Sequence, residues 1–138
     1  MTIRSAIGAA GAAIAIAIAM PAAAHDLGET VTPHFEKAIP NIPGKTLSAL
    51  IVDYEPGGTS LPHDHAKSAF IFAYVISGEI ESKVNDGPTE TFRAGESWYE
   101  PPGSAHLVSR NASKTKPAKL LAVIVHDSGE KNITTPRD

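Results

Sequence analysis

The chain has 138 residues, a formal net charge of −3 and no cysteine. The absence of cysteine excludes disulfide bonds and thiolate metal ligands, so a bound metal would have to be held by imidazole nitrogen or by oxygen. Acidic and basic residues are interspersed, and the one basic cluster, Lys114, Lys116 and Lys119, alternates with Ser, Thr and Pro as in a solvated loop. This distribution argues against a nucleic-acid partner.

The first 24 residues have the pattern of a cleavable secretory signal peptide. Arg4 precedes the apolar run IGAAGAAIAIAIAM and the segment PAAA, in which Ala22 and Ala24 satisfy the small-x-small rule for cleavage. The apolar run is shorter than the roughly 20 residues needed to span a bilayer, so we expect no stable membrane anchor. We expect a periplasmic or secreted protein whose mature chain, residues 25–138, forms a single domain.

The rest of the chain alternates short runs of aliphatic, β-branched and aromatic residues with Gly and Pro, which is typical of an antiparallel β-sandwich or barrel. No helical pattern competes with this interpretation. Strands are predicted at residues 34–39, 46–55, 70–77, 79–84, 90–94, 97–100, 105–111 and 119–127.

Three segments carry more specific expectations. In the hairpin that joins 79–84 to 90–94, Asp86 and Gly87 are expected to supply the positive φ angles of a tight turn. The run KLLAVIV is apolar on both faces, which predicts a central strand covered on both sides. The polar residues 128–138 are expected to form a mobile tail.

Histidines are the candidates for chemistry. His63 and His65 are one residue apart, so in an extended backbone both imidazoles point to the same side. The segment Pro101-Pro102-Gly103 forms a rigid turn before a strand that carries His106, which could bring a third imidazole from a different strand.

Two segments, GGTSLPHDHAKSAFIFAYVISGE and GESWYEPPGSAH, resemble the two motifs of the cupin family. The resemblance covers residues 45–127 and implies an all-β, double-stranded β-helix (jelly-roll) barrel, with a homodimer as the expected assembly. The matching positions are Gly57 or Gly58, His63, His65 and Gly78 in the first motif, and Gly95, Pro101, Gly103 and His106 in the second.

The sequence departs from the family pattern in both motifs. Ala69 or Phe70 stands where cupins usually place a metal-binding Glu, and Arg110 stands where many have Asn, with Asn111 displaced by one residue. The resemblance therefore implies a divalent metal held by His63, His65 and His106 alone. Three neutral imidazoles would leave the ion its full charge, which favours an anion in the open positions.

This arrangement resembles cupins that hold iron with three histidines, which suggests a dioxygenase-like enzyme acting on a small anionic molecule. Imidazole also suits Zn, Ni and Cu, and the identity of the metal, Mn included, stays open. Zinc would indicate hydrolytic or lyase chemistry instead. A non-catalytic periplasmic barrel that binds a small molecule or sugar is the alternative, and a structural role with a vestigial site is a third hypothesis.

Other residues around the motifs are weaker candidates. Tyr99, if it points inward, is a candidate catalytic acid or hydrogen-bond donor, whereas Glu100 is expected at the surface. His25 would become the first residue after cleavage, where it could chelate copper, although a mobile terminus is the simpler interpretation. His34 and His126 are expected to be surface or locally hydrogen-bonded residues. Phe70, Phe72 and Tyr74 alternate, and their aromatic face is expected to line or close the barrel.

Overall fold

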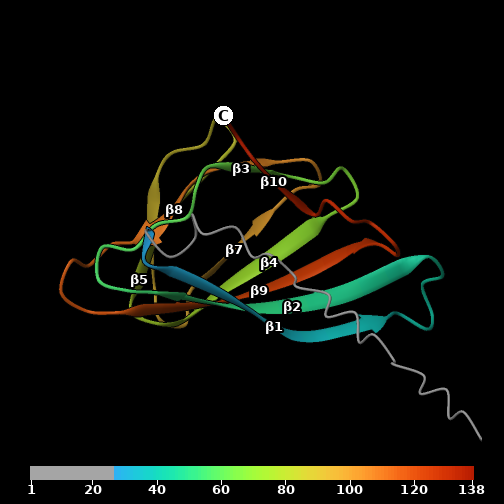
Figure 1. Ribbon diagram of the computed structural model, residues 1–138, viewed down its shortest axis with the longest axis horizontal. Helices are drawn as coiled ribbons and strands as arrows, with labels where there is room; N and C mark the ends of the chain where they lie inside the picture. Colours follow the sequence, from blue (N-terminus) through green and yellow to red (C-terminus); the bar gives the residue numbers. More distant parts are fainter. Residues whose placement is uncertain (1–26) are drawn as a thin grey trace, which may run out of the picture.

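Ten β-strands make up the part of the chain that this computed structural model describes, residues 27–138 (Figure 1). The expected signal peptide and His25 lie outside the described residues. No helix within residues 27–138 is long and apolar enough to cross a membrane. The strands are β1 (Glu29–Ala38), β2 (Lys45–Tyr54), β3 (His63–His65), β4 (Phe70–Ser77), β5 (Glu79–Val84), β6 (Glu90–Arg93), β7 (Ser97–Glu100), β8 (Ala105–Asn111), β9 (Ala118–Asp127) and β10 (Thr134–Pro136).

The strands form two five-stranded sheets of antiparallel pairs. One sheet has the order β1-β2-β9-β4-β7 and the other β10-β3-β8-β5-β6. In Figure 1, strands β1, β2, β9 and β4 form the lower layer, and β3 and β10 lie above it. The fold is therefore all-β, with the two facing sheets of a double-stranded β-helix, as the motifs predicted.

Most strand positions agree with the sequence. The predictions for 70–77, 79–84, 97–100 and 105–111 are confirmed to the residue. The first strand starts at Glu29, earlier than predicted, and continues through Pro33. Pro33 is tolerated because β1 is an edge strand and its register with β2 shifts between Pro33 and Phe35.

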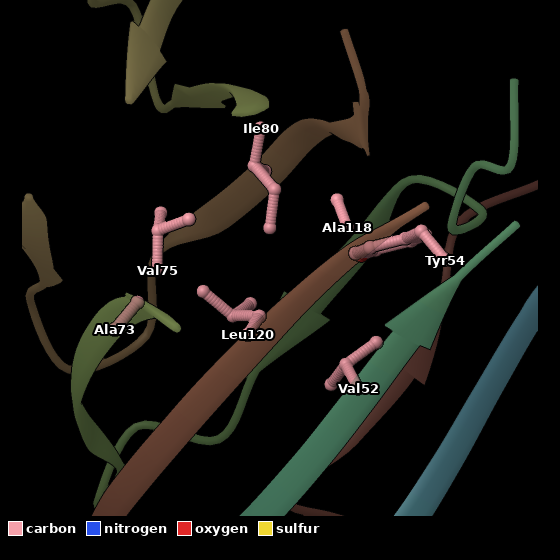
Figure 2. Packing of buried hydrophobic residues seen from close by; sticks show 7 residues of the cluster. All are labelled: Val52, Tyr54, Ala73, Val75, Ile80, Ala118 and Leu120. Atoms are coloured by element: carbon pink, nitrogen blue, oxygen red, sulfur yellow. The ribbon is translucent and has the colours of Figure 1, made fainter. Parts of the chain in front are cut away.

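The main hydrophobic core lies between the two sheets at the end where β4 turns into β5. Its buried side chains come from β2, β4, β5 and β9 (Figure 2): Val52, Tyr54, Ala73, Val75, Ile80, Ala118 and Leu120. Gly78 joins β4 to β5 with a φ of 75°, and a Cβ there would lie 2.6 Å from the carbonyl oxygen of Pro117. Any other residue at position 78 would push the β4–β5 corner away from β9.

The aromatic face of β4 points away from the core, contrary to the sequence expectation. Ile71 and Ala73 are buried, whereas Phe70 is 43% exposed, Phe72 42% and Tyr74 36%. Both faces of this strand are apolar, so alternation alone does not decide which one faces inward. The smaller side chains face inward because they leave room for an internal cavity.

The hairpin between β5 and β6 is confirmed, but its turn differs from the prediction. The residue with positive φ is Asn85, at 51°, while Asp86 and Gly87 have ordinary values. Asn is among the residues that adopt this conformation most readily. The side-chain oxygen of Asn85 accepts a hydrogen bond from the backbone N–H of Ala105, which ties the turn to the start of β8.

The polar C-terminal segment is not simply a mobile tail. Residues 134–136 form β10, which pairs with β3 so that Thr134 lies opposite His65 and Pro136 opposite His63. The backbone N–H of Ala66 also donates to the carbonyl oxygen of Ile133. Pairing through the backbone leaves no hydrophobic signature, so the composition of this segment did not reveal it.

Candidate metal centre

Strands β3 and β8 bring the three predicted histidines together. Because β3 is extended, His63 and His65 lie on the same side of it, and His63 is the direct cross-strand partner of His106. The ring centroid of His63 lies 4.8 Å from that of His65 and 5.1 Å from that of His106. One nitrogen from each ring lies within 4.8 Å of the others. The separation fits nitrogen ligands around one ion.

In each of the three histidines, one ring nitrogen contacts a polar group outside the cluster. His63 donates from Nδ1 to the carbonyl oxygen of Leu61 at 2.8 Å, and Nε2 of His106 lies 2.9 Å from the Ser82 hydroxyl. Nδ1 of His65 lies 3.5 Å from the hydroxyl of Thr134 on β10. Such outer contacts orient metal-ligating histidines and select their tautomers.

A carboxylate that the sequence placed at the surface lies inside this site. Glu100 is only 2% exposed, with its Oε2 2.9 Å from Nε2 of His65 and its Oε1 3.2 Å from Nδ1 of His106. The indole N–H of Trp98 donates to the same Oε1 at 3.2 Å. The expectation of a surface position for Glu100 is therefore wrong: alternation along β7 turns Trp98 and Glu100 inward and Tyr99 outward.

Two buried atoms of this site lie close together without forming a hydrogen bond. Nε2 of His65 and Oε2 of Glu100 are buried and make no hydrogen bond of acceptable geometry, although they lie 2.9 Å apart. Two buried polar atoms that face the same space without a well-formed bond are suited to a shared third partner. A divalent cation between imidazole nitrogens and a carboxylate oxygen would satisfy both, so the donor set fits a metal ion.

Protonation in this site also suits metal binding. Burial lowers the pKa of His106 to about 4, and burial lowers the pKa of His63 as well. Burial alone would raise the pKa of Glu100, but the contacts with His65, His106 and Trp98 outweigh it and hold that pKa below its ordinary value. At neutral pH His63 and His106 are thus neutral and Glu100 is ionised, which are the forms that coordinate cations.

The site opens into a cavity of about 540 Å³ inside the barrel. All three histidines and Glu100 line it, and its remaining walls are mainly aliphatic. The aliphatic side chains include Leu50, Val52, Ile71, Ala73, Leu120 and Ile124. A concave, mostly apolar cavity with a few convergent polar groups is the usual form of a small-molecule site.

Comparison with protein families gives independent evidence for the fold. The model of the cupin domain matches residues 50–124. The chain belongs to the cupin family. This match spans β3, β7 and β8, the strands that carry the three histidines and Glu100.

Curated relatives of this cupin are plant proteins. It is 31% identical to germin-like protein subfamily 2 member 2 of Arabidopsis thaliana over 100 residues, and 27% identical to the rhicadhesin receptor of Pisum sativum over 99 residues. The alignments cover 70% and 69% of this chain. They cover 44% of each relative, so the cupin spans less than half of their length.

Solved structures show the same fold. A recombinant oxalate oxidase in complex with glycolate is 28% identical, with a TM-score of 0.56, covering 71% of this chain and 51% of that one. An uncharacterised protein with a double-stranded β-helix domain from Klebsiella pneumoniae has a TM-score of 0.62, covering 80% of this chain and 84% of its own. The second is only 18% identical, so it supports the fold alone.

Three residues that the sequence placed near the motifs, Tyr99, Ala69 and Phe70, do not reach the site. Tyr99 is 63% exposed and stacks on Phe70 outside the barrel, with ring centroids 5.9 Å apart, so the candidate catalytic role for Tyr99 is not supported. Ala69 is buried in a separate hydrophobic cluster, and Phe70 points outward. The carboxylate that lies beside the histidines is therefore Glu100 of the second motif, not a residue of the first.

The other described histidines stay outside the cluster. His34 is exposed on β1, while His126 is 3% exposed and contacts the Ser48 hydroxyl through Nε2 at 2.9 Å. Nδ1 of His126 donates to the carbonyl oxygen of Asp127. Both agree with the expectation of surface or locally hydrogen-bonded residues.

Replacing two of the histidines should remove bound metal without unfolding the barrel. In a His63→Ala, His106→Ala double variant we expect near-stoichiometric metal to be lost, because two of the three nitrogen donors are gone, while the core around Tyr54 is untouched. Elemental analysis of protein purified without chelating resin measures this, beside far-UV circular dichroism. His34→Ala is the matched control. Retained metal in the double variant would refute the ligand assignment.

Replacing Glu100 tests the role of the buried carboxylate. Glu100→Gln keeps the shape but removes the negative charge between His65 and His106, so we expect metal affinity to fall roughly 10- to 100-fold. Competition with a chromophoric chelator measures that affinity. Glu90→Gln, on exposed β6, is the control. Equal affinity in the wild type and Glu100→Gln would show that this carboxylate does not act on the metal.

Proposed function

We propose that this cupin binds one divalent metal ion through His63, His65 and His106 and acts on a small anionic molecule by dioxygenase-like chemistry. The observation that carries the proposal is the convergence of three imidazoles and a buried carboxylate at the wall of an apolar cavity. A metal bound there would supply Lewis acidity and, with iron or manganese, redox chemistry.

The chain's own residues would hold and orient the ligand. Glu100 lowers the net charge of a bound divalent ion below the value expected from three histidines alone, so the preference for an anion is weaker than the sequence suggested. A positive charge still remains at the centre, and the aliphatic wall limits access of water. Both features favour a small molecule with one anionic end and an apolar body.

Relatives support the choice of substrates for a first assay. Structures similar to this cupin include an oxalate oxidase bound to the substrate analogue glycolate, at 26% identity and a TM-score of 0.56. We therefore propose oxalate, glycolate and longer 2-hydroxy and 2-oxo acids as the first compounds to test. The runner-up function is a non-catalytic cupin that binds a small molecule, which the same cavity would also serve.

Oxygen uptake separates these two functions. The protein is loaded separately with Fe²⁺, Mn²⁺ and Zn²⁺. The iron or the manganese form should consume oxygen with at least one of these acids, whereas the zinc form should not. The His63→Ala, His106→Ala variant should be inactive in parallel. Metal-dependent binding of the acids without turnover of any kind would favour the binding cupin instead.

We also propose that the chain is exported through residues 1–24, on the sequence pattern described above. Its assembly has support from the described residues. On the outer face of the β1-β2-β9-β4-β7 sheet, one row of directly paired residues is apolar across all five strands: Phe35, Ala49, Val123, Phe72 and Tyr99. Leu121 and Ile51 extend this face in the next row beside Tyr74. We name these eight residues the outer apolar face.

We propose that the outer apolar face is covered by a second copy of the chain. With strands about 4.8 Å apart and outward residues about 6.8 Å apart along each strand, the eight residues cover roughly 260 Å² in projection. A stable interface buries roughly 800 Å² on each partner, so this face would form the apolar centre of the interface and the surrounding rim would supply the rest. Its central row has no charged residue, so it matches an identical apolar face better than a charged partner.

Charges placed on this face should separate the copies. We expect the wild type to sediment as a dimer and Phe72→Glu to sediment as a monomer, because a carboxylate buried between two apolar faces has no partner. Ile42→Glu is the control, since Ile42 is 47% exposed in the connection between β1 and β2 and is not part of the face. A monomeric wild type at micromolar concentration would refute this assembly.

A further inference from the structure

A second polar cluster lines the cavity that holds the histidines. Four groups form a chain of contacts: Glu29 with Ser60, Ser60 with Tyr54 at 2.6 Å, and Tyr54 with Ser109 at 2.8 Å. Tyr54 is 2% exposed and Ser109 4%, and all four residues line the cavity. Phe in place of Tyr54 and Ala in place of the two serines would fill similar space without polar atoms. The barrel therefore does not need this chain of hydroxyls for its core.

Proton counting gives the chain a direction. Ser60 donates its only hydroxyl proton to the Glu29 carboxylate. Ser60 must therefore accept from Tyr54, and Tyr54, having donated its own proton, must accept from Ser109. Every O–H in the chain then points toward Glu29, and Ser109 is left with lone pairs only.

The end of this chain lies a short distance from the metal centre. Ser109 and His106 both belong to β8, where Ser109 pairs with Ser82 and His106 with Val84, on the same inward side. Two or three residues of extended strand separate them by roughly 7 to 10 Å. A molecule with four to six heavy atoms between its ends could contact both.

We infer that Ser109, oriented through Tyr54 and Ser60 by Glu29, is a second ligand subsite that accepts a hydrogen bond from an O–H or N–H group of the bound molecule. This inference rests on the proposed function, because the other end of the molecule would be a carboxylate at the metal. The ligand class is a short acid with a hydrogen-bond donor at its far end. Burial raises the pKa of Glu29, while its contact with Ser60 opposes that change.

The hydroxyl form of this ligand fits the cavity better than the ammonium form. Apart from the metal centre and this chain of hydroxyls, the cavity walls are mainly aliphatic, so a full positive charge loses much of its hydration there, whereas a hydroxyl loses far less. A carbonyl at the same position would place an acceptor against an acceptor. The subsite should therefore rank the far-end groups in the order hydroxyl, then ammonium or methyl, then carbonyl.

Calorimetric titration of the zinc-loaded protein tests this order without requiring turnover. The probes are 3-hydroxypropanoate, 4-hydroxybutyrate and 5-hydroxypentanoate, each paired with the alkanoate that carries methyl in place of hydroxyl. 4-Aminobutyrate and 4-oxopentanoate test the ammonium and carbonyl arms. We expect at least one hydroxy acid to bind roughly two- to tenfold more tightly than its methyl partner, as for one hydrogen bond.

Two variants change the subsite in different ways. Ser109→Ala should abolish the hydroxyl preference while the alkanoates bind as before. Tyr54→Phe frees the Ser109 proton, so Ser109 could donate, and 4-oxopentanoate should gain affinity relative to the wild type. Thr46→Val is the control, because its buried hydroxyl contacts Ser128 and does not line the cavity.

The outcomes separate the two proposals. Metal-dependent binding of the acids with equal affinity for hydroxyl and methyl partners, or an undiminished hydroxyl preference in Ser109→Ala, would overturn the subsite and leave the metal centre standing. Binding that does not need the metal, or no binding by any probe, would overturn the proposed function and the subsite with it.

Discussion

The contact between Glu100 and two imidazoles organises the interior of this cupin. A carboxylate that is 2% exposed costs several kcal/mol to bury unless cations or hydrogen-bond donors surround it. Here the indole N–H of Trp98 donates to it, and Nε2 of His65 and Nδ1 of His106 lie 2.9 and 3.2 Å from its oxygens, so the contacts come from three strands of both sheets. The sheets must therefore keep their spacing and register at this point, and the same constraint holds the nitrogens at a distance suited to one ion.

The period of two residues in a β-strand explains what the sequence could and could not predict. His63 and His65 must share a side, so their convergence followed from the sequence as soon as β3 was extended. Glu100 and Tyr99 are neighbours on β7, and only one of them can face inward. The sequence offered no decision, because Trp98 beside Glu100 and Tyr99 beside Phe70 are equally plausible packings. Pairing of β7 with β4 decides it.

In β4, too, alternation left open which face of the strand points inward. Phe70, Phe72 and Tyr74 carry the larger apolar surface, which suggested an inward face, yet Ile71 and Ala73 are the residues that line the cavity. A barrel that encloses 540 Å³ cannot fill its interior with aromatic rings. The aromatic side chains are then left on the outer face, which is the face that we propose a second copy covers. β10 was missed for a different reason, because it contributes backbone pairing and no hydrophobic pattern.

The two carboxylates that line the cavity, buried Glu100 and half-buried Glu29, have different surroundings, and this difference orients a ligand. Glu100 has imidazoles around it, so its pKa falls and its charge contributes to a cation site. Glu29 has no cation in its hydrogen-bond chain, only the hydroxyl of Ser60, and burial raises its pKa. A cation bound at the histidines draws the anionic end of a molecule, while the hydroxyl chain from Glu29 presents lone pairs at Ser109. Reversing such a molecule would place its anion against those lone pairs and its donor against the cation. One orientation is thereby strongly favoured, although the remaining walls of the cavity are mainly aliphatic.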